Sequence, residues 1–404
     1  MTRTVYVHIG LPKTGTSYLQ QCLRHNRDDL TAIGWHLPGH RSRDQRHAVW
    51  DLLGRRIQGS AQRQVAGAWQ RLVDEIASSP AEHCIVSEEF LVHARPAHVR
   101  RVTRALSPRE LHVVVTVRDL GRVMSSMWQQ NTAKARTVRW SEFVSAVRDP
   151  EHGPATSGVA FWLRYDLARV LDTWGVAVPP ERIHIVTVPP AGTGPEVLWA
   201  RFCSATGMDA GALRAVDSTV HPAVDAVQAE TLRRLNSRLG GRLSEQDYLF
   251  MMSNVLRPSL RGSTDGSGIA FPPDHREWLM RRCEDVVQVV QGKPYHVVGD
   301  VDDLRSQAEV IEGENPDDVA DAAVAATAMT LLAATLEHYA ATRSTAQRRG
   351  SSRPAVTSLG SRMSSFTRSL SHQSKVRALE LADHNRLVAR LASAYLRRSS
   401  ASKS

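Results

Sequence analysis

Gly10-Leu11-Pro12-Lys13-Thr14-Gly15-Thr16-Ser17 is the segment from which the architecture of this chain can be predicted. It follows the β-branched run 4–9 and precedes apolar residues at helical spacing in 18–23. A strand, a glycine-containing loop and a helix in this order direct backbone N–H groups into one concavity, to which the helix N-terminus adds partial positive charge. The pattern predicts a phosphate-binding loop; the alternative is an ordinary strand-to-helix turn.

The lysine of this loop is displaced from its position in nucleotide-triphosphate loops. Those loops follow the pattern G-x-x-x-x-G-K-[ST], which Gly10, Gly15 and Ser17 match, whereas Thr16 occupies the lysine position. The cation is Lys13, in the middle of the loop, where it would meet a group attached beyond a 5′-phosphate. The pattern therefore indicates phosphate binding and disfavours an ATPase.

The loop resembles the first signature of the sulfotransferases that use 3′-phosphoadenosine 5′-phosphosulfate (PAPS), Pro-Lys-x-Gly-Thr-[Thr/Ser]. The resemblance implies that Lys13 assists sulfuryl transfer and that Tyr18, where the family more often has Trp, stacks on adenine. It also implies that the 5′-phosphosulfate is held by the loop residues Pro12, Lys13, Thr14, Gly15, Thr16 and Ser17.

A second signature follows the apolar run 111–117, which we interpret as a buried strand. Arg118 ends this run and Ser126 comes eight positions later, the spacing at which family members bind the 3′-phosphate. Ligands of parallel sheets bind at the carboxyl ends of strands, and a guanidinium with a hydroxyl suits a phosphate monoester. The alternatives are a surface pair between Arg118 and a carboxylate, and Ser125 in place of Ser126.

Two carboxylates, Glu88 and Glu89, end a short strand predicted over 83–87. Sulfuryl transfer to a hydroxyl needs a general base, and in the family a strand at this place in the order ends in that base. The form Ser-x-Glu-Phe-Leu favours Glu89, with Glu88 as the alternate. Strand alternation directs the two side chains to opposite faces, and either could instead form a structural ion pair.

The resemblance implies in-line transfer of the sulfuryl group from PAPS to a hydroxyl or amine of an acceptor, with no metal. The acceptor could be a small molecule, a glycan or a lipid, and the insertion 34–47, with its basic residues, is either its binding segment or a plain surface loop. A small-molecule kinase on a related fold is the alternative function. A non-catalytic scaffold is disfavoured by the joint presence of Lys13, Glu89, Arg118 and Ser126.

Alternating strands and helices predict an α/β, three-layer, P-loop kinase-like fold with a central parallel sheet. We expect strands near 4–9, 83–87, 111–117, 182–188 and 295–298. We expect helices near 16–26, 61–78, 96–106, 119–132, 159–174, 195–206, 223–239 and 273–291.

Composition and charge indicate a cytoplasmic enzyme with a basic tail. The 404 residues are 42% hydrophobic, the four cysteines are isolated in apolar stretches, and the first strand begins too early for a signal peptide. Residues 343–404 carry 13 Lys or Arg and only two acids, so this segment has a charge of +11 and the first 342 residues are nearly neutral, against a net charge of +10 for the whole chain. With no base-reading motif, we expect no nucleic-acid partner.

We expect a sulfotransferase domain over 1–312, an Ala-rich helix over 313–342 and a largely disordered tail over 343–404. An amphipathic helix near 375–398 would let that tail contact a membrane surface or an acidic partner. The family's late Arg-Lys-Gly segment, which closes over the nucleotide, has only a weak counterpart in 259–266.

Overall fold

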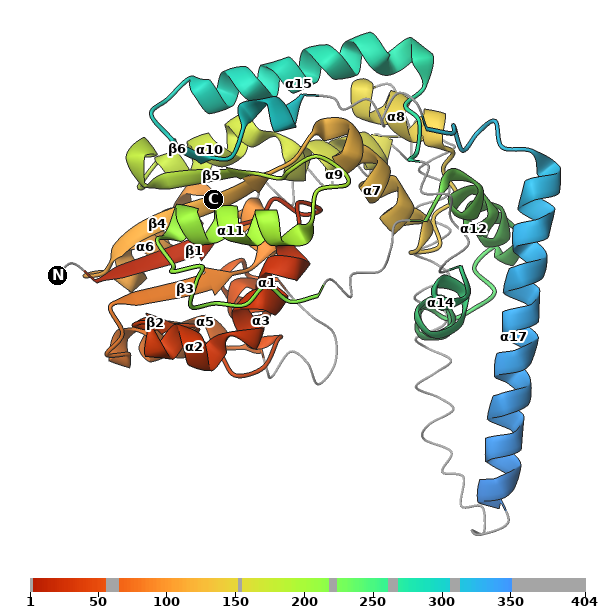
Figure 1. Cartoon of the computed structure of the whole chain (residues 1–404), viewed down its shortest axis with the longest axis horizontal. Helices are drawn as coiled ribbons and strands as arrows, with labels where there is room; N and C mark the ends of the chain where they lie inside the picture. Colours follow the sequence, from red (N-terminus) through yellow and green to blue (C-terminus); the bar gives the residue numbers. More distant parts are fainter. Residues whose placement is uncertain are drawn as a thin grey trace.

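A computed structural model describes residues 3–55, 65–151, 155–217, 224–260, 268–305 and 313–350. Its centre is a six-stranded parallel sheet of order β2-β3-β1-β4-β5-β6 with helices on both faces (Figure 1). The predicted α/β fold with a central parallel sheet is confirmed. The strands are β1 (Thr4–His8), β2 (Trp35–His36), β3 (His83–Ser87), β4 (Glu110–Val117), β5 (Ile183–Thr187) and β6 (His296–Val298).

The strand order reverses direction at β1. The chain passes from β1 to β2 and β3 on one side and then crosses to β4, β5 and β6 on the other. Ligands of open parallel sheets bind beyond the carboxyl ends of the strands at such a switch point. The segments that follow β1, β3 and β4 therefore meet at one edge of the sheet.

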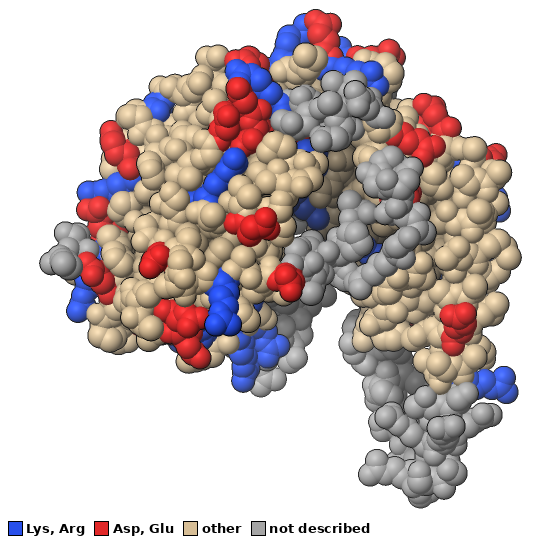
Figure 2. Space-filling view, viewed as in Figure 1, with Lys and Arg blue, Asp and Glu red and all other residues tan. Residues whose placement is uncertain are grey.

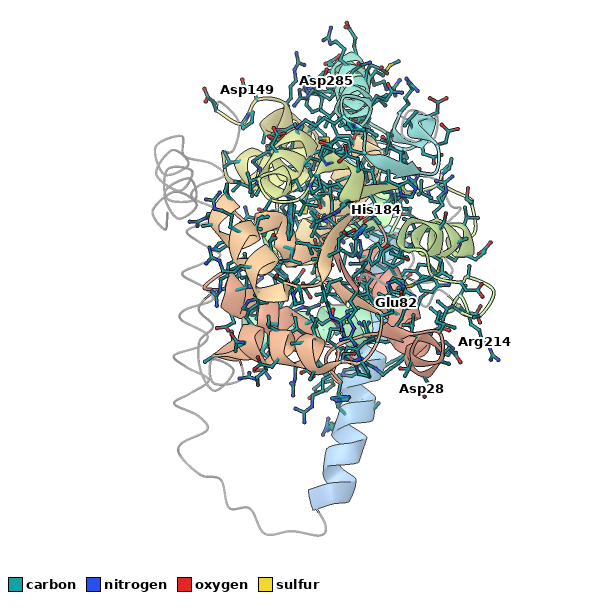
Figure 3. The ribbon with its side chains drawn as sticks, turned by 90° about the vertical axis from the view of Figure 1, so that its left-hand side faces the viewer. Asp28, Glu82, Asp149, His184, Arg214 and Asp285 are labelled. Atoms are coloured by element: carbon teal, nitrogen blue, oxygen red, sulfur yellow. The ribbon has the colours of Figure 1, made fainter. Side chains whose placement is uncertain are left out.

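The strands pair in a register that suits a sheet covered on both faces. Val7 of β1 pairs with Val86 of β3 and Val113 of β4, and all three are buried. The near-continuous apolar run of β4 is typical of a strand with helices on either side. His184 of β5, labelled near the middle of the molecule in Figure 3, lies between His112 and His296, with ring nitrogens 2.8 and 2.7 Å away.

Two apolar clusters hold the helices to the two faces of the sheet. One contains Leu19 and Phe202, from α1 (Thr16–His25) and α11 (Pro195–Thr206). The segment after α11 returns to the start of α2 (Arg27–Ala32). There the Asn26 side chain exchanges hydrogen bonds with the backbone of Arg214. Figure 3 labels Arg214 and the nearby Asp28. The larger cluster packs the other face with α3 (Asp44–Leu52), α5 (Ala68–Ser78), α6 (Pro96–Leu106), α7 (Leu120–Thr132), α8 (Trp140–Arg148), α10 (Leu167–Gly175) and α15 (Arg276–Gln291).

The structure differs from the sequence prediction in several segments, among them 159–174 and 34–47, and it contains the unpredicted helices α2, α8 and α13 (Glu245–Met251). The helix expected over 159–174 is two helices, α9 (Ala155–Tyr165) and α10, because the Asp166 carboxylate accepts a hydrogen bond from the Arg169 N–H at 3.0 Å and starts a new helix. The insertion 34–47 is not a plain loop, since it contains β2 and the start of α3. Short, weakly periodic segments such as these carry little sequence signal.

The C-terminal helices α12 (Ala226–Leu239), α14 (Arg257–Ser259) and α17 (Asp321–Gly350) lie together beside the sheet (Figure 1). Arg234 of α12 pairs with Asp321 of α17 at 2.6 Å. The predicted domain limits stay a prediction, and the helix expected near 375–398 lies outside the described residues. Among the described helices, none has the length and apolar character to cross a membrane.

Candidate active site

The loop 10–17 is fixed to the end of β4 by backbone and side-chain hydrogen bonds. The Leu11 N–H donates to the Thr116 carbonyl at 2.9 Å, and the Thr116 N–H donates to the Gly10 carbonyl at 2.6 Å. The hydroxyls of Thr14 and Thr116 lie 2.5 Å apart, and both threonines are fully buried. These contacts hold the loop in one shape before any ligand arrives.

Gly15 joins the loop to α1. Its φ of 86° lies in the left-handed region, and a Cβ built there would lie 2.4 Å from Cδ2 of Leu198. The left-handed backbone favours glycine at this position, and a Cβ would in addition displace the Leu198 side chain. Among the described residues no side chain caps α1, so the first N–H groups of the helix remain available to an anion, which the helix dipole favours.

Arg118 contacts the loop 10–17. Its guanidinium donates a hydrogen bond from Nη1 to the Lys13 carbonyl at 3.2 Å, although 105 positions separate the two residues. Its Nε is buried and has no hydrogen-bond partner among the described residues. Burial and the nearby Arg122 lower the pKa of Arg118 to about 10, so the group remains charged at neutral pH. A buried, charged and incompletely bonded guanidinium is suited to receive an anion.

Glu89 and Glu88 occupy different surroundings. Glu89 begins a 3₁₀ helix (Glu89–His93), and its carboxylate accepts a hydrogen bond of 2.7 Å from the Thr16 hydroxyl of the loop. Glu88 is 2% exposed and lies 3.5 Å from Nε of Arg46. Burial, opposed by Arg46, raises the pKa of Glu88 to about 7. The structure thus places Glu89, the predicted base, against the loop, and Glu88 on the side of α3.

Lys13 lies in a field of positive charge. Burial, followed by the charges of Lys134 and Arg257, lowers its pKa to about 8, and Glu89 opposes this shift. Arg118 adds a further small repulsion. Four cations around one carboxylate form a site with excess positive charge, which a multiply charged anion would neutralise.

The remaining predicted site residues are Pro12, Ser17, Tyr18 and Ser126. Tyr18 is 4% exposed and packs in the cluster beneath α1, so its ring offers little free face to an adenine in this conformation. Ser126 is half-buried, about two turns into α7, while the Ser125 hydroxyl donates to the Arg122 carbonyl at 3.2 Å. The exposed Ser17 and half-buried Pro12 complete the loop. The roles assigned to these residues stay predictions.

Sequence patterns missed several residues that the fold brings to this site. Lys134 follows α7, Arg164 and Tyr165 end α9, and Arg257 begins α14. The Tyr165 hydroxyl is buried without a hydrogen-bond partner among the described residues, and burial raises its pKa. None of these four belongs to a motif, so no spacing could have identified them. Residues 261–266 of the weak Arg-Lys-Gly counterpart lie outside the described residues.

Other polar groups near the loop have structural roles. His8 is fully buried, with ring nitrogens 2.8 Å from the Ser87 hydroxyl and 3.2 Å from that of Thr116. Burial lowers its pKa to about 3, so it stays neutral. The carboxylate of Asp119 accepts from the Gly121 and Arg122 N–H groups and starts α7. Within the described ranges, no three His, Cys, Asp or Glu side chains form a metal-binding group.

Comparison with known proteins identifies no family for this chain. No family model matches it, and no curated protein matches it. A solved structure, a sulfotransferase from Alicyclobacillus acidocaldarius, is similar over 62% of this chain and 96% of its own, with 15% identity and a TM-score of 0.35. So low a TM-score supports no conclusion about the activity of the present protein.

Proposed function

We propose that this protein is a sulfotransferase that moves the sulfuryl group of PAPS to a hydroxyl or amine of an acceptor. The observation that carries the proposal is the contact between Arg118 and the Lys13 carbonyl, at 3.2 Å. It joins a phosphate loop and a strand-end guanidinium into one cationic site of the kind that a nucleotide with phosphates at both ends requires.

The proposed reaction is an in-line displacement at sulfur. The acceptor oxygen forms a bond to sulfur as the bond from sulfur to the bridging oxygen of the donor breaks, and that electron pair leaves with adenosine 3′,5′-bisphosphate. The acceptor proton passes to the Glu89 carboxylate. Positioning and electrostatic stabilisation dominate the analogous phosphoryl transfers, and we expect the same here.

Each residue has a role that its position supports. Lys13 projects from the middle of the loop and would neutralise the charge that grows on the bridging oxygen. The N–H groups at the start of α1 would hold the 5′-phosphate, and Arg118 with Ser126 would bind the 3′-phosphate. The Thr16 hydroxyl, 2.7 Å from the Glu89 carboxylate, would keep the base beside the loop. The proposal requires no metal.

A small-molecule kinase is the second candidate, and one contact favours it. P-loop kinases hold Mg²⁺ with a loop hydroxyl and a strand-end carboxylate, and the hydroxyl of Thr16 lies 2.7 Å from the carboxylate of Glu89, although the hydroxyl at the kinase position is that of Ser17. Against this candidate, Thr16 stands where those enzymes have the lysine that contacts the β- and γ-phosphates.

Calorimetric titration separates the two candidates. We expect adenosine 3′,5′-bisphosphate to bind in the presence of EDTA, and Arg118→Met to weaken its binding by about a hundredfold, as expected for the loss of a charge-assisted contact. Arg101→Met, at an exposed position of α6, is the control. Tighter binding of ATP with Mg²⁺ than of the metal-free bisphosphate would reverse the assignment in favour of a kinase.

A further inference from the structure

Helix α17 is attached to the rest of the protein along one stripe of its surface. Val324 and Leu331 on this stripe are buried, and the ring of His338 lies 5.8 Å from that of Phe250. The three helix positions recur every seven residues, so they lie along one face. Helix α17 packs there against α12, α14 and the turn Met252–Leu256 (Figure 1). The other faces of the helix are directed away from these elements.

A second stripe of α17 consists of large apolar side chains that are exposed. We call it the outer seam, and its members are Met329, Leu332, Leu336 and Tyr339. Their exposed fractions lie between 49% and 64%. Successive members are three, four and three positions apart, which is the spacing of the residues that helices use to pair with each other. Single exposed apolar residues are normal, but four in line on one helix face indicate an interaction surface.

The outer seam lies in an uncharged part of the helix. The sequence has no Asp, Glu, Lys or Arg over 322–336, and Figure 2 shows this side of the molecule, at the right, as largely tan. A helix that lies on a membrane surface has Lys and Arg beside its apolar face, and 321–342 contains neither. A nucleic-acid partner would likewise require cations. The outer seam therefore suits the apolar face of another protein helix.

The charged residues near the two ends of α17 have opposite signs. Asp318 and Asp321 are exposed just before the helix and at its first residue. Arg343, Arg348 and Arg349 belong to its last eight residues. Two copies of the helix in antiparallel orientation would set the basic end of each against the acidic end of the other, whereas a parallel pair would bring like charges together. This complementarity favours a second copy of the chain as the occupant of the outer seam.

We propose that this protein forms a two-fold symmetric dimer in which the outer seams of two antiparallel α17 helices pack together. With the two-fold axis between them, Leu332 of one copy packs on Leu336 of the second copy, and Met329 lies beside Tyr339 of the second copy. A two-fold interface uses the same patch on both copies, and this seam is complementary to itself in that way. The helix spans about 45 Å, so the leucines form the centre of the interface and the charged ends form its rim. The inference does not depend on the proposed sulfotransferase function.

The test is analytical ultracentrifugation of the full chain at roughly 1–100 μM. We expect the wild type to sediment as a dimer, and Leu332→Glu/Leu336→Glu to weaken dimerisation by about a hundredfold or more, because four leucines leave the interface. Met280→Glu changes an exposed apolar residue of α15 and is the matched control, which should remain a dimer. Leu332→Ala/Leu336→Ala preserves the helix propensity and should shift the equilibrium in the same direction by a smaller factor. Thermal melts of these variants separate a loss of pairing from a loss of folding.

Cysteine cross-linking tests the orientation of the two helices. The four natural cysteines are buried, so new thiols on the outer seam are the ones that oxidise. A mixture of Met329→Cys and Tyr339→Cys should form a covalent dimer of the two variants, while neither variant should cross-link to itself. A wild type that is monomeric at every concentration, or a dimer that persists in Leu332→Glu/Leu336→Glu, would overturn the inference. Cross-linking of each variant only to itself would overturn the antiparallel arrangement.

Discussion

Raising the pH from 7 to 9 should weaken the binding of adenosine 3′,5′-bisphosphate through Lys13. The pKa of Lys13 is lowered to about 8 in the free protein by burial and by the neighbouring cations. The bound phosphates place negative charge beside the ammonium and raise its pKa in the complex, so binding takes up a proton. The charged fraction of free Lys13 falls from about nine-tenths at pH 7 to about one-tenth at pH 9, which weakens binding by about tenfold, or ~1.4 kcal/mol.

Calorimetry in buffers of different ionisation enthalpy measures both the affinity and the proton uptake. The phosphate monoesters have a second pKa of about 6, so they stay ionised over this range. Lys13→Met should bind more weakly at pH 7 and show no further loss up to pH 9. An unchanged wild-type affinity between pH 7 and 9, or the same decline in Lys13→Met, would refute the placement of Lys13 against the ligand.

Three further predictions concern the loop and the two carboxylates. Gly15→Ala should lower the free energy of unfolding by roughly 1–3 kcal/mol, because the new Cβ would strain the left-handed backbone and clash with Leu198. Gly34→Ala is the control, because Gly34 has a similar φ of 81° but no atom within 4 Å of its Cβ position, so this variant bears only the backbone strain. Thermal melts of both variants test the prediction. Glu88 has a folded pKa of about 7, above its unfolded value, so this carboxyl makes the wild type lose up to roughly 3 kcal/mol of stability as the pH rises from 4.5 to 7. Glu88→Gln should flatten that part of the urea-unfolding profile, and an unaltered slope would show that Glu88 ionises normally. Glu89→Gln should abolish transfer of labelled sulfate, measured with a screened acceptor, while bisphosphate affinity is retained; full turnover in this variant would remove Glu89 from the mechanism.

Local patterns predicted those parts of the fold that have strong periodicity or loop chemistry. The apolar runs of β1, β3, β4 and β5 and the glycines around Lys13 carried enough information to predict a parallel sheet with a phosphate loop after its first strand. The four cysteines, which are isolated in apolar stretches of the sequence, are free and buried. The prediction was wrong where one capping side chain or a short element determines the local structure, as in the single helix expected over 159–174.

The sequence alone determined that a glycine-containing loop joins the first strand to a helix, because the required backbone conformations depend on glycines within a few residues of each other. Only the tertiary structure decided that Arg118 reaches Lys13 and that Glu89 contacts Thr16. These contacts join residues far apart in the chain, and they exist because the strand order reverses at β1 and brings three strand ends to one edge. Spacing along a sequence carries no information about such distances, since they depend on how the whole sheet is assembled.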